Sequence, residues 1–209
     1  MKIGIFGGGQ LGRMMALAAY PFNLAFSFYE SAENCPSAPL GEVIGDKEAG
    51  KASLDAFLAS ADVFTYEFEN IPVAWVEHIA QHKPVYPSVK SLAVSQNRLN
   101  EKQLFAKLGI PAAAYHEVRS QADLQQAVDS LGLPLVIKTT MGGYDGKGQF
   151  VIRQAEQVGQ AWSELQGGAP LIAEAFIRFE RELSIIAVRA QDGETRCYPL
   201  AWNTHHQGI

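Results

Sequence analysis

Hydrophobic and polar residues in the first part of the chain alternate between short apolar runs and helical patterns. The apolar runs predict strands, and apolar residues that recur at helical spacing predict helices. The expected strands lie at 2–6, 25–30, 62–67 and 85–86, and the expected helices at 10–20, 53–61 and 73–81. Because strands and helices alternate, the pattern predicts an α/β fold with a parallel, doubly wound sheet.

The pattern changes near residue 90. Ser120 is expected to cap a helix that ends at Leu131, and Asp123 in its first turn favours the same start. The other expected elements are a mostly helical stretch at 88–108, strands at 135–139, 149–153 and 171–174, a helix at 155–165, and strands at 182–189 and 195–201 that pair across a turn at 191–193. We therefore expect an α/β domain over residues 1–97 and an α+β domain over residues 98–209.

Composition and charge disfavour several classes of protein. The formal net charge is −5 and there is no long basic run, which argues against a nucleic-acid-binding protein. The two cysteines, Cys35 and Cys197, are far apart, so neither a disulfide framework nor a cysteine metal site is indicated. The chain lacks a signal-peptide pattern and any apolar stretch of the roughly 18 residues that a membrane span needs. A cytoplasmic protein is the expectation.

Three glycines, Gly7, Gly9 and Gly12, follow the first expected strand and open the first expected helix. In this context glycines allow a tight turn and let a phosphate approach the amides of the helix N-terminus. Glu30 lies roughly where a dinucleotide-binding fold places its ribose-binding acid. A dinucleotide site, another phosphate site and a tight turn without ligand all remain open from this motif.

Glu67 and Glu69 follow the third expected strand. They are two residues apart, so in an extended chain they share a face at the carboxyl edge, where open α/β sheets bind ligands. Paired carboxylates suit sugar hydroxyls or an amine. A solvated loop start is the alternative interpretation.

The strongest chemical signal is a lysine at the end of an apolar strand, followed by a glycine-rich loop. Lys138 ends the run that begins at residue 135, and four glycines lie within residues 142–148. Such a loop can turn several N–H groups inward around phosphate oxygens, while Lys138 and Lys147 add positive charge. The spacing is not that of a P-loop, and a plain hairpin is the alternative.

Acids and histidines mark the later strands. Glu174 ends the strand expected at 171–174 and could recognise an adenine edge, and Glu182 could reach ribose hydroxyls. Each could equally be an ordinary acid at a strand end. His205 and His206 are adjacent, so on a strand they face opposite ways and make a poor metal pair, although one of them could contact a ligand.

Taken in order, these segments resemble the N5-carboxyaminoimidazole ribonucleotide synthetases of the ATP-grasp superfamily. Two segments are specific: Thr-Tyr-Glu-Phe-Glu-Asn at 65–70 and Gly-Gly-Tyr-Asp-Gly-Lys-Gly-Gln at 142–149. The other matching segments lie at 7–14, 96–102, 181–184 and 203–205. The resemblance implies a Rossmann-like pre-ATP-grasp domain over 1–97 and the N-terminal part of an α+β ATP-grasp domain over 98–209.

The family carboxylates 5-aminoimidazole ribonucleotide with bicarbonate and ATP, through carboxyphosphate, in de novo purine synthesis. The resemblance implies that the ribonucleotide contacts Gln10, Leu11, Glu67, Glu69, Tyr144 and Asp145. It implies that ATP is held by Arg98, Lys138, Gly143, Tyr144, Asp145, Gly146, Lys147, Gly148, Gln149, Glu174, Ala175, Phe176, Ile177, Glu182 and His205.

By the same resemblance, Lys138, Tyr144 and Asp145 are the catalytic residues. Lysine charge and magnesium would offset the charge that develops during phosphoryl transfer, and Asp145 would orient or deprotonate the amine. The family's magnesium ligands match no residue of this chain, and a homodimer is implied. The strand expected at 195–201 has no covering helix, so we expect a truncated chain. Because the family's magnesium ligands are not matched, we expect this chain to be inactive alone.

Other classes of protein remain open. A sister ATP-grasp ligase, such as a formate-dependent glycinamide ribonucleotide transformylase or a biotin carboxylase, is disfavoured by residues 66–70. An NAD-dependent oxidoreductase would use the first glycine motif and Glu30, but it leaves residues 138–149 unexplained. The third alternative is a non-catalytic nucleotide-binding or interaction module.

Overall fold

The computed structural model describes residues 1–45, 51–143, 147–167 and 170–204. The chain divides into two compact units, Met1–Leu104 and Phe105–Ile209, and the division falls within helix α5 (Arg98–Leu108). The domain boundary expected at residue 97 stays a prediction. No helix in the described ranges is both long enough and apolar enough to cross a membrane.

Unit 1 is built on a four-stranded sheet with the order β3-β2-β1-β4, in which each strand pair is parallel. The strands are β1 (Lys2–Phe6), β2 (Ala25–Tyr29), β3 (Glu42–Ile44) and β4 (Val63–Tyr66). The predicted parallel α/β sheet is confirmed. The strand expected at 85–86 is only a bridge from Val85 to Phe64, because a proline without an N–H stands on each side of that dipeptide.

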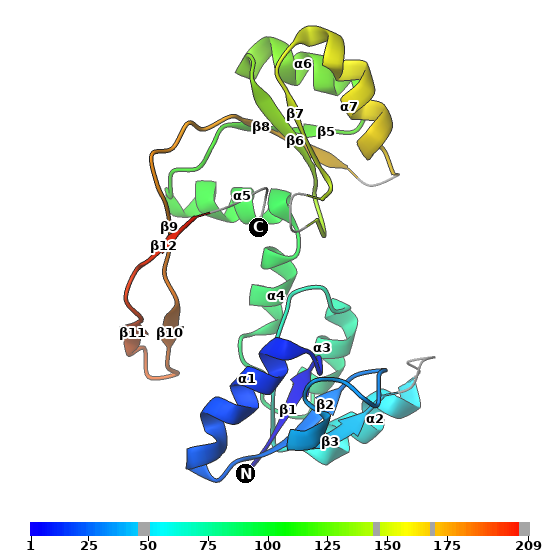
Figure 1. Ribbon diagram of the computed structural model, residues 1–209, viewed down its shortest axis with the longest axis vertical. Helices are drawn as coiled ribbons and strands as arrows, with labels where there is room; N and C mark the ends of the chain where they lie inside the picture. The colour runs from blue at the N-terminus through cyan, green and yellow to red at the C-terminus, as the bar shows by residue number, and fades with distance from the viewer. Residues whose placement is uncertain (46–50, 144–146, 168–169, 205–209) are drawn as a thin grey trace. The chain divides into compact units, whose positions relative to one another are not determined.

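Helices cover both faces of this sheet. Successive residues of β1 point to opposite faces, so Ile5 packs with Ala16 of α1 while Phe6 packs with residues of α2 and α3. The helical segments of unit 1 are α1 (Gln10–Ala19), η1 (Tyr20–Phe22), η2 (Ala38–Leu40), α2 (Lys51–Ser60), α3 (Val73–Ala80), α4 (Val89–Ser95) and the start of α5 (Figure 1).

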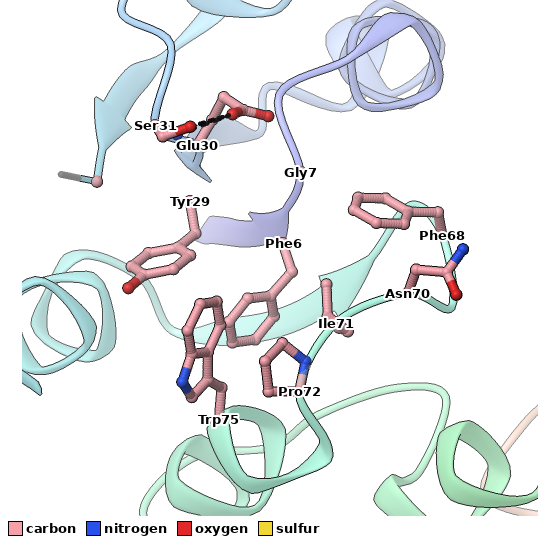
Figure 2. A pocket seen from close by; sticks show the side chains of 11 residues that line it. Phe6, Gly7, Tyr29, Glu30, Ser31, Phe68, Asn70, Ile71, Pro72 and Trp75 are labelled. Carbon is pink, nitrogen blue, oxygen red and sulfur yellow. Dashed lines mark hydrogen bonds between the residues drawn. The ribbon is translucent and has the colours of Figure 1, made fainter. Parts of the chain in front are cut away.

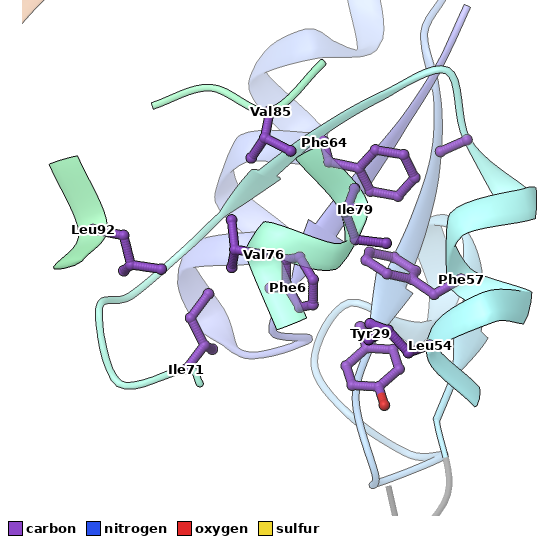
Figure 3. Packing of buried hydrophobic residues seen from close by; sticks show 11 residues of the cluster. Phe6, Tyr29, Leu54, Phe57, Phe64, Ile71, Val76, Ile79, Val85 and Leu92 are labelled. Atoms are coloured by element: carbon purple, nitrogen blue, oxygen red, sulfur yellow. The ribbon is translucent and has the colours of Figure 1, made fainter. Parts of the chain in front are cut away.

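Aromatic rings form the centre of the larger core of unit 1 (Figure 3). Phe57 meets Phe6 at 4.9 Å and Phe64 at 5.0 Å between ring centroids, and both contacts are edge-to-face. All three residues are fully buried, and burying a phenylalanine stabilises a fold by roughly 1.5–3 kcal/mol. This packing fixes the ends of β1 and β4, from which the residues of the first candidate site follow.

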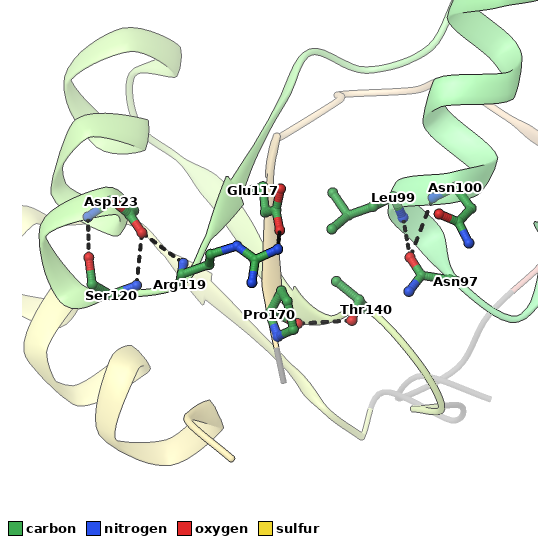
Figure 4. A network of polar contacts seen from close by, with 9 residues as sticks. All are labelled: Asn97, Leu99, Asn100, Glu117, Arg119, Ser120, Asp123, Thr140 and Pro170. Atoms are coloured by element: carbon green, nitrogen blue, oxygen red, sulfur yellow. Dashed lines mark hydrogen bonds and ion pairs between the residues drawn. The ribbon is translucent and has the colours of Figure 1, made fainter. Parts of the chain in front are cut away.

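The stretch expected to be helical at 88–108 is two helices, with a break at Gln96 and Asn97. The Asn97 side-chain oxygen accepts hydrogen bonds from the amides of Leu99, at 2.9 Å, and Asn100, at 3.4 Å (Figure 4). Asn97 therefore caps the start of α5 and ends the preceding helix.

Unit 2 contains an antiparallel sheet with the order β5-β8-β6-β7. Its strands are β5 (Tyr115–Val118), β6 (Leu135–Thr139), β7 (Gln149–Ile152) and β8 (Leu171–Ala175). The helical segments are α6 (Gln121–Leu131), η3 (Ala155–Gln157) and α7 (Val158–Leu165), and α6 and α7 share one core with the sheet (Figure 1). The predicted cap of α6 is present as a capping box between Ser120 and Asp123 (Figure 4).

The hairpin expected at 182–201 forms, but it is interrupted. The inner pair is β10 (Ala187–Arg189) with β11 (Thr195–Cys197), and the outer pair is β9 (Glu182–Ser184) with β12 (Ala201–Asn203). The gap between β11 and β12 is one residue longer than the gap between β9 and β10. Pro199 stands in that longer gap and has no N–H for a ladder bond, which accounts for the interruption.

Candidate functional site

The glycine-rich turn of unit 1 binds a carboxylate of its own chain. Glu67 follows β4, and its two carboxylate oxygens accept hydrogen bonds from the amides of Gly9, at 3.0 Å, and Gly12. These amides belong to the cap and the first turn of α1, where free N–H groups and the helix dipole favour an anion. Glu67 therefore occupies the position in which a dinucleotide-binding fold places a phosphate.

The three glycines of this motif make room for Glu67. A Cβ at Gly7 or Gly9 would lie 2.5 Å or 2.8 Å from the Oε1 atom of Glu67, and a Cβ at Gly12 would lie 2.8 Å from its Oε2 atom. These separations are shorter than the contacts that real Cβ atoms make. Gly7 also has a φ of 103°, which disfavours any other residue.

Glu30 is engaged by the neighbouring turn. Its carboxylate accepts hydrogen bonds from the amides of Ser31, at 2.8 Å, and Gly8, at 3.3 Å, and from the Ser31 hydroxyl at 3.2 Å. With Glu30 on Gly8 and Glu67 on Gly9 and Gly12, the amides that would hold a dinucleotide already have acceptors. This geometry disfavours the NAD interpretation.

The remaining residues expected at the ribonucleotide site lie around the same turn. Gln10 and Leu11 open α1 and are exposed, and Glu69 is exposed beyond β4, whereas Glu67 is half-buried. The structure therefore separates the two acids that the sequence pattern placed on one face: Glu67 is bound to the turn and Glu69 faces solvent.

Lys138 and Glu174 lie close together in unit 2. From the sequence, Lys138 is expected to bind the phosphates of a nucleotide and Glu174 its adenine. Lys138 lies in β6 and Glu174 in the adjacent β8, and the register pairs Lys138 with Ile172 and Val136 with Glu174. The Lys138 Nζ atom and the Glu174 Oε2 atom lie 2.6 Å apart. Glu174 is buried and the Lys138 side chain is partly exposed, so one ammonium is held beside a buried carboxylate at the end of a strand.

The loop between β6 and β7 depends on glycine at several positions. Gly142, Gly143 and Gly148 have φ values of 63°, 72° and 69°, and a Cβ at Gly143 would lie 2.7 Å from the backbone oxygen of Lys147. Lys147 and Gln149 are exposed, and Gln149 pairs with Lys138 across the ladder. Tyr144, Asp145 and Gly146 lie outside the described residues.

The segment after β8 continues from Glu174 through Ala175, Phe176 and Ile177. The guanidinium carbon of Arg153 lies 5.8 Å from the centroid of the Phe176 ring, and Ile177 is exposed. Further along, Glu182 in β9 accepts a hydrogen bond of 3.2 Å from the Asn203 amide of β12. His205 and His206 lie outside the described residues.

Arg98 opens α5 in unit 1 and is half-buried. Among the residues that the structure describes, no group of three or more His, Cys, Asp or Glu side chains could hold a metal ion. Cys35 is buried and Cys197 is exposed, and both are free thiols.

Family models match both units. One described as an ATP-grasp domain matches residues 103–209, and one described as a ribonucleotide synthetase preATP-grasp domain matches residues 1–96. The chain belongs to the ATP-grasp family.

Three of the individual proteins that are similar to this chain carry an enzyme name that is narrower than the descriptions of the family models. The chain is 47% identical to the N5-carboxyaminoimidazole ribonucleotide synthase of Pseudomonas aeruginosa, over 100% of this chain and 58% of that protein. N5-carboxyaminoimidazole synthetase from Staphylococcus aureus complexed with ADP has 30% identity and a TM-score of 0.94, covering 100% of this chain and 56% of that one.

A third relative was solved with both ligands. N5-carboxyaminoimidazole synthase from Aspergillus clavatus, in complex with ADP and 5-aminoimidazole ribonucleotide, has 28% identity and a TM-score of 0.87, covering 100% of this chain and 55% of that one. The resemblance to this family that the sequence indicated is confirmed. The chain spans little more than half the length of these relatives.

Proposed function

We propose that this chain supplies the ribonucleotide-binding domain and the first part of the ATP-binding domain of an enzyme that carboxylates 5-aminoimidazole ribonucleotide. In this reaction bicarbonate takes the γ-phosphoryl group of ATP, which gives carboxyphosphate and ADP. The exocyclic amine then forms a bond to the carboxyl carbon as phosphate leaves and the amine loses a proton. The product is N5-carboxyaminoimidazole ribonucleotide, an intermediate of purine synthesis.

The observation that carries the proposal is the position of Lys138 next to Glu174, at the start of the glycine-rich loop. A strand holds the ammonium group, so little side-chain freedom is lost when it meets a phosphate. Gly143 and Gly148 give the loop a tight backbone whose amides can turn toward phosphate oxygens. Glu174 and the backbone of residues 175–177 would then face the adenine, and Glu182 the ribose.

Within this proposal the Glu67 carboxylate shapes the ribonucleotide site by holding the glycine turn. The exposed residues Gln10, Leu11 and Glu69 are the ones that we propose to contact the ribonucleotide. Arg98, Gly146, Lys147, Gln149 and His205 complete the proposed ATP contacts. Tyr144 and Asp145 are proposed at the junction of ATP and substrate, with Asp145 accepting the amine proton.

Magnesium, a homodimer and a cytoplasmic location belong to the same proposal. Magnesium takes oxygen ligands and usually bridges substrate phosphates. The described residues form no cluster of acids for it, so the proposal assigns no residue of this chain to the metal. The domain boundary at residue 97 is retained as part of the proposal.

A chimera provides the direct test, because the chain aligns with a relative over its whole length. The matching 58% of the Pseudomonas aeruginosa enzyme is replaced by these 209 residues, and ADP release is measured. We expect release that requires both bicarbonate and 5-aminoimidazole ribonucleotide. Lys138→Met in the chimera is expected to abolish it, and Lys107→Met, at an exposed position of α5, is the matched control.

The other outcomes identify the competing functions. Release that requires formate and glycinamide ribonucleotide instead would identify a sister ligase. Nucleotide binding without turnover in a folded chimera would favour a non-catalytic module, and binding of NADH detected by fluorescence would favour an oxidoreductase. The 209-residue chain by itself is expected to release no ADP under any of these conditions.

A further inference from the structure

Unit 1 contains a cavity whose described lining residues include none of those proposed to contact ATP or the ribonucleotide. It has a volume of about 310 Å³ and lies at the carboxyl ends of the parallel strands. Its walls come from the end of β1 (Phe6, Gly7), the end of β2 (Tyr29, Glu30, Ser31), the segment after β3 (Gly45), the segment after β4 (Phe68, Asn70, Ile71, Pro72) and α3 (Trp75) (Figure 2). Small-molecule sites in open α/β proteins occur at this edge.

Aromatic rings dominate the apolar part of the cavity. Tyr29 lies between Phe6, at 5.6 Å, and Trp75, at 5.4 Å between ring centroids, and both contacts are edge-to-face. Phe68 adds a partly exposed ring at the rim. Rings in this arrangement favour a flat ligand, because a planar π system can stack or meet a ring edge at little entropic cost.

The polar groups define which flat ligands fit. Glu30 is the ionisable acid among the described lining residues, and none of those residues is a lysine or an arginine. Its carboxylate is fixed by the amides of Gly8 and Ser31. A phosphate or carboxylate on the ligand would therefore meet a fixed negative charge that no cation among the described lining residues offsets, whereas N–H donors would be favoured.

Tyr29 meets the cavity with its ring and not with its hydroxyl. The residue is 8% exposed, and its hydroxyl oxygen is buried without a hydrogen-bond partner in the described part of the chain. Because this oxygen has almost no accessible surface, a ligand in the cavity contacts the ring of Tyr29, and the polar contact falls to Glu30. Burial raises the pKa of the Tyr29 phenol, so the buried hydroxyl stays uncharged near neutral pH.

We propose that this cavity binds a small planar nitrogen heterocycle that carries N–H donors and no anionic group, such as an unphosphorylated nucleobase or imidazole-type ring. The volume is at the low end of the range of about 300–1,000 Å³ for ligand pockets, which suits one ring system and its substituents. The site differs from the proposed ATP and ribonucleotide sites, because both of those must accept phosphate groups.

The test uses the full chain with Trp75 as the fluorescent reporter. Trp162 and Trp202, both in unit 2, are replaced by phenylalanine so that only Trp75 reports. Benzimidazole is the probe, 1-methylbenzimidazole removes the N–H donor, and benzimidazole-5-carboxylate adds an anion. We expect a saturable change with benzimidazole and at least roughly fivefold weaker binding of each analogue, as the loss of a hydrogen bond or an added repulsion predicts.

Two glutamate variants assign the binding to this cavity. Glu30→Gln keeps the size of the side chain and removes the charge that the ligand N–H is expected to meet, so we expect benzimidazole affinity to fall about threefold to tenfold. Glu33→Gln, at an exposed position three residues away, is the matched control and should leave the affinity unchanged. Circular dichroism establishes that each variant is folded.

Two results would overturn the inference. One is a folded protein whose Trp75 fluorescence shows no saturable change at millimolar benzimidazole. The other is binding of the carboxylate analogue as tight as that of benzimidazole, with no effect of Glu30→Gln. Neither result bears on the ligase proposal, because these probes carry no phosphate and the reporter lies in unit 1.

Discussion

The ammonium of Lys138 and the carboxylate of Glu174 lie 2.6 Å apart on adjacent antiparallel strands. In the absence of a nucleotide, Glu174 is thus the partner that keeps the lysine ammonium at the end of β6. A phosphate that binds Lys138 must share the ammonium with this carboxylate. The pair sets the position of the positive charge before any ligand arrives, which is what preorganisation of a binding site requires.

Replacing Lys138 with methionine should weaken nucleotide binding by the chain. The expected loss of ADP affinity is about tenfold or more, because a charge-assisted hydrogen bond contributes roughly 1.5–3 kcal/mol. Isothermal titration calorimetry measures the affinity. Lys107→Met, in the exposed last turn of α5, is the matched control. Equal ADP affinity of the two variants would remove Lys138 from the nucleotide site.

Glu67→Gln should destabilise unit 1. The amide side chain keeps one acceptor for Gly9 or Gly12 and turns an NH2 group toward the other N–H donor. We expect a decrease of about 1.5–3 kcal/mol in the free energy of unfolding, measured by urea titration. Glu69→Gln, two residues away and exposed, should have little effect. Similar stability of both variants would show that the turn does not need the carboxylate.

Gly12→Ala tests the same contact from the other side. Alanine in a helix normally stabilises by up to about 1 kcal/mol relative to glycine. At Gly12 the new Cβ would lie 2.8 Å from Glu67 Oε2, so we expect destabilisation instead. Gly159→Ala in α7 is the control, because its nearest contact is 3.7 Å away. If Gly12→Ala and Gly159→Ala both raised the melting temperature, the crowding at Glu67 would be refuted.

Asp123 should contribute to the acid sensitivity of unit 2. The amide of Arg119 and the groups of Ser120 hold the pKa of this carboxyl below its ordinary value. A carboxyl with a lowered pKa contributes stability above its unfolded-state pKa of about 3.9, and this contribution is lost as the pH falls through the folded-state pKa. Asp123→Asn should therefore reduce the difference in unfolding free energy between pH 7 and pH 3.

Asp129→Asn on the same helix serves as the reference for that comparison, since Asp129 lies near the C-terminus of α6 and takes no part in the capping box. Urea unfolding followed by circular dichroism at both pH values gives the two differences. An Asp123→Asn protein with the full pH difference of the parent would contradict a role of this carboxyl in acid unfolding.

The sequence predicts a helix or strand well where a local pattern, such as a capping box or an apolar run, determines that element. The capping box at Ser120, the apolar runs of β1 and β6 and the alternation in unit 1 all lie in local patterns, and these elements are present. β3 and β5, with three and four residues, carry too little periodicity to be recognised. The hairpin after residue 181 was predicted as one ladder, because a single proline in the return strand is a weak signal.

The candidate site shows a sharper limit. The sequence identifies Lys138, Glu174 and Glu67 as chemically interesting, but the partner of each is set by register between strands or by the approach of a distant turn. The bond from Gly9 to Glu67 joins residues 58 positions apart. No local pattern encodes such a distance. The sequence therefore leaves a ligand phosphate at the glycine turn open, whereas the fold places its own acid there.

The Glu67 contact also constrains the order in which unit 1 can assemble. The acceptor for the first amides of α1 is Glu67, which lies 55 to 58 positions later in the chain. These amides therefore lack this acceptor while α1 forms by itself. The amides of Gly9 and Gly12 gain their acceptor when β4 has aligned beside β1, across the loop that contains β2, β3 and α2. Because this contact closes a long loop, it forms only after β4 pairs with β1. Hydrogen exchange of the amides of Gly9 and Gly12 should therefore slow only when the central sheet is complete.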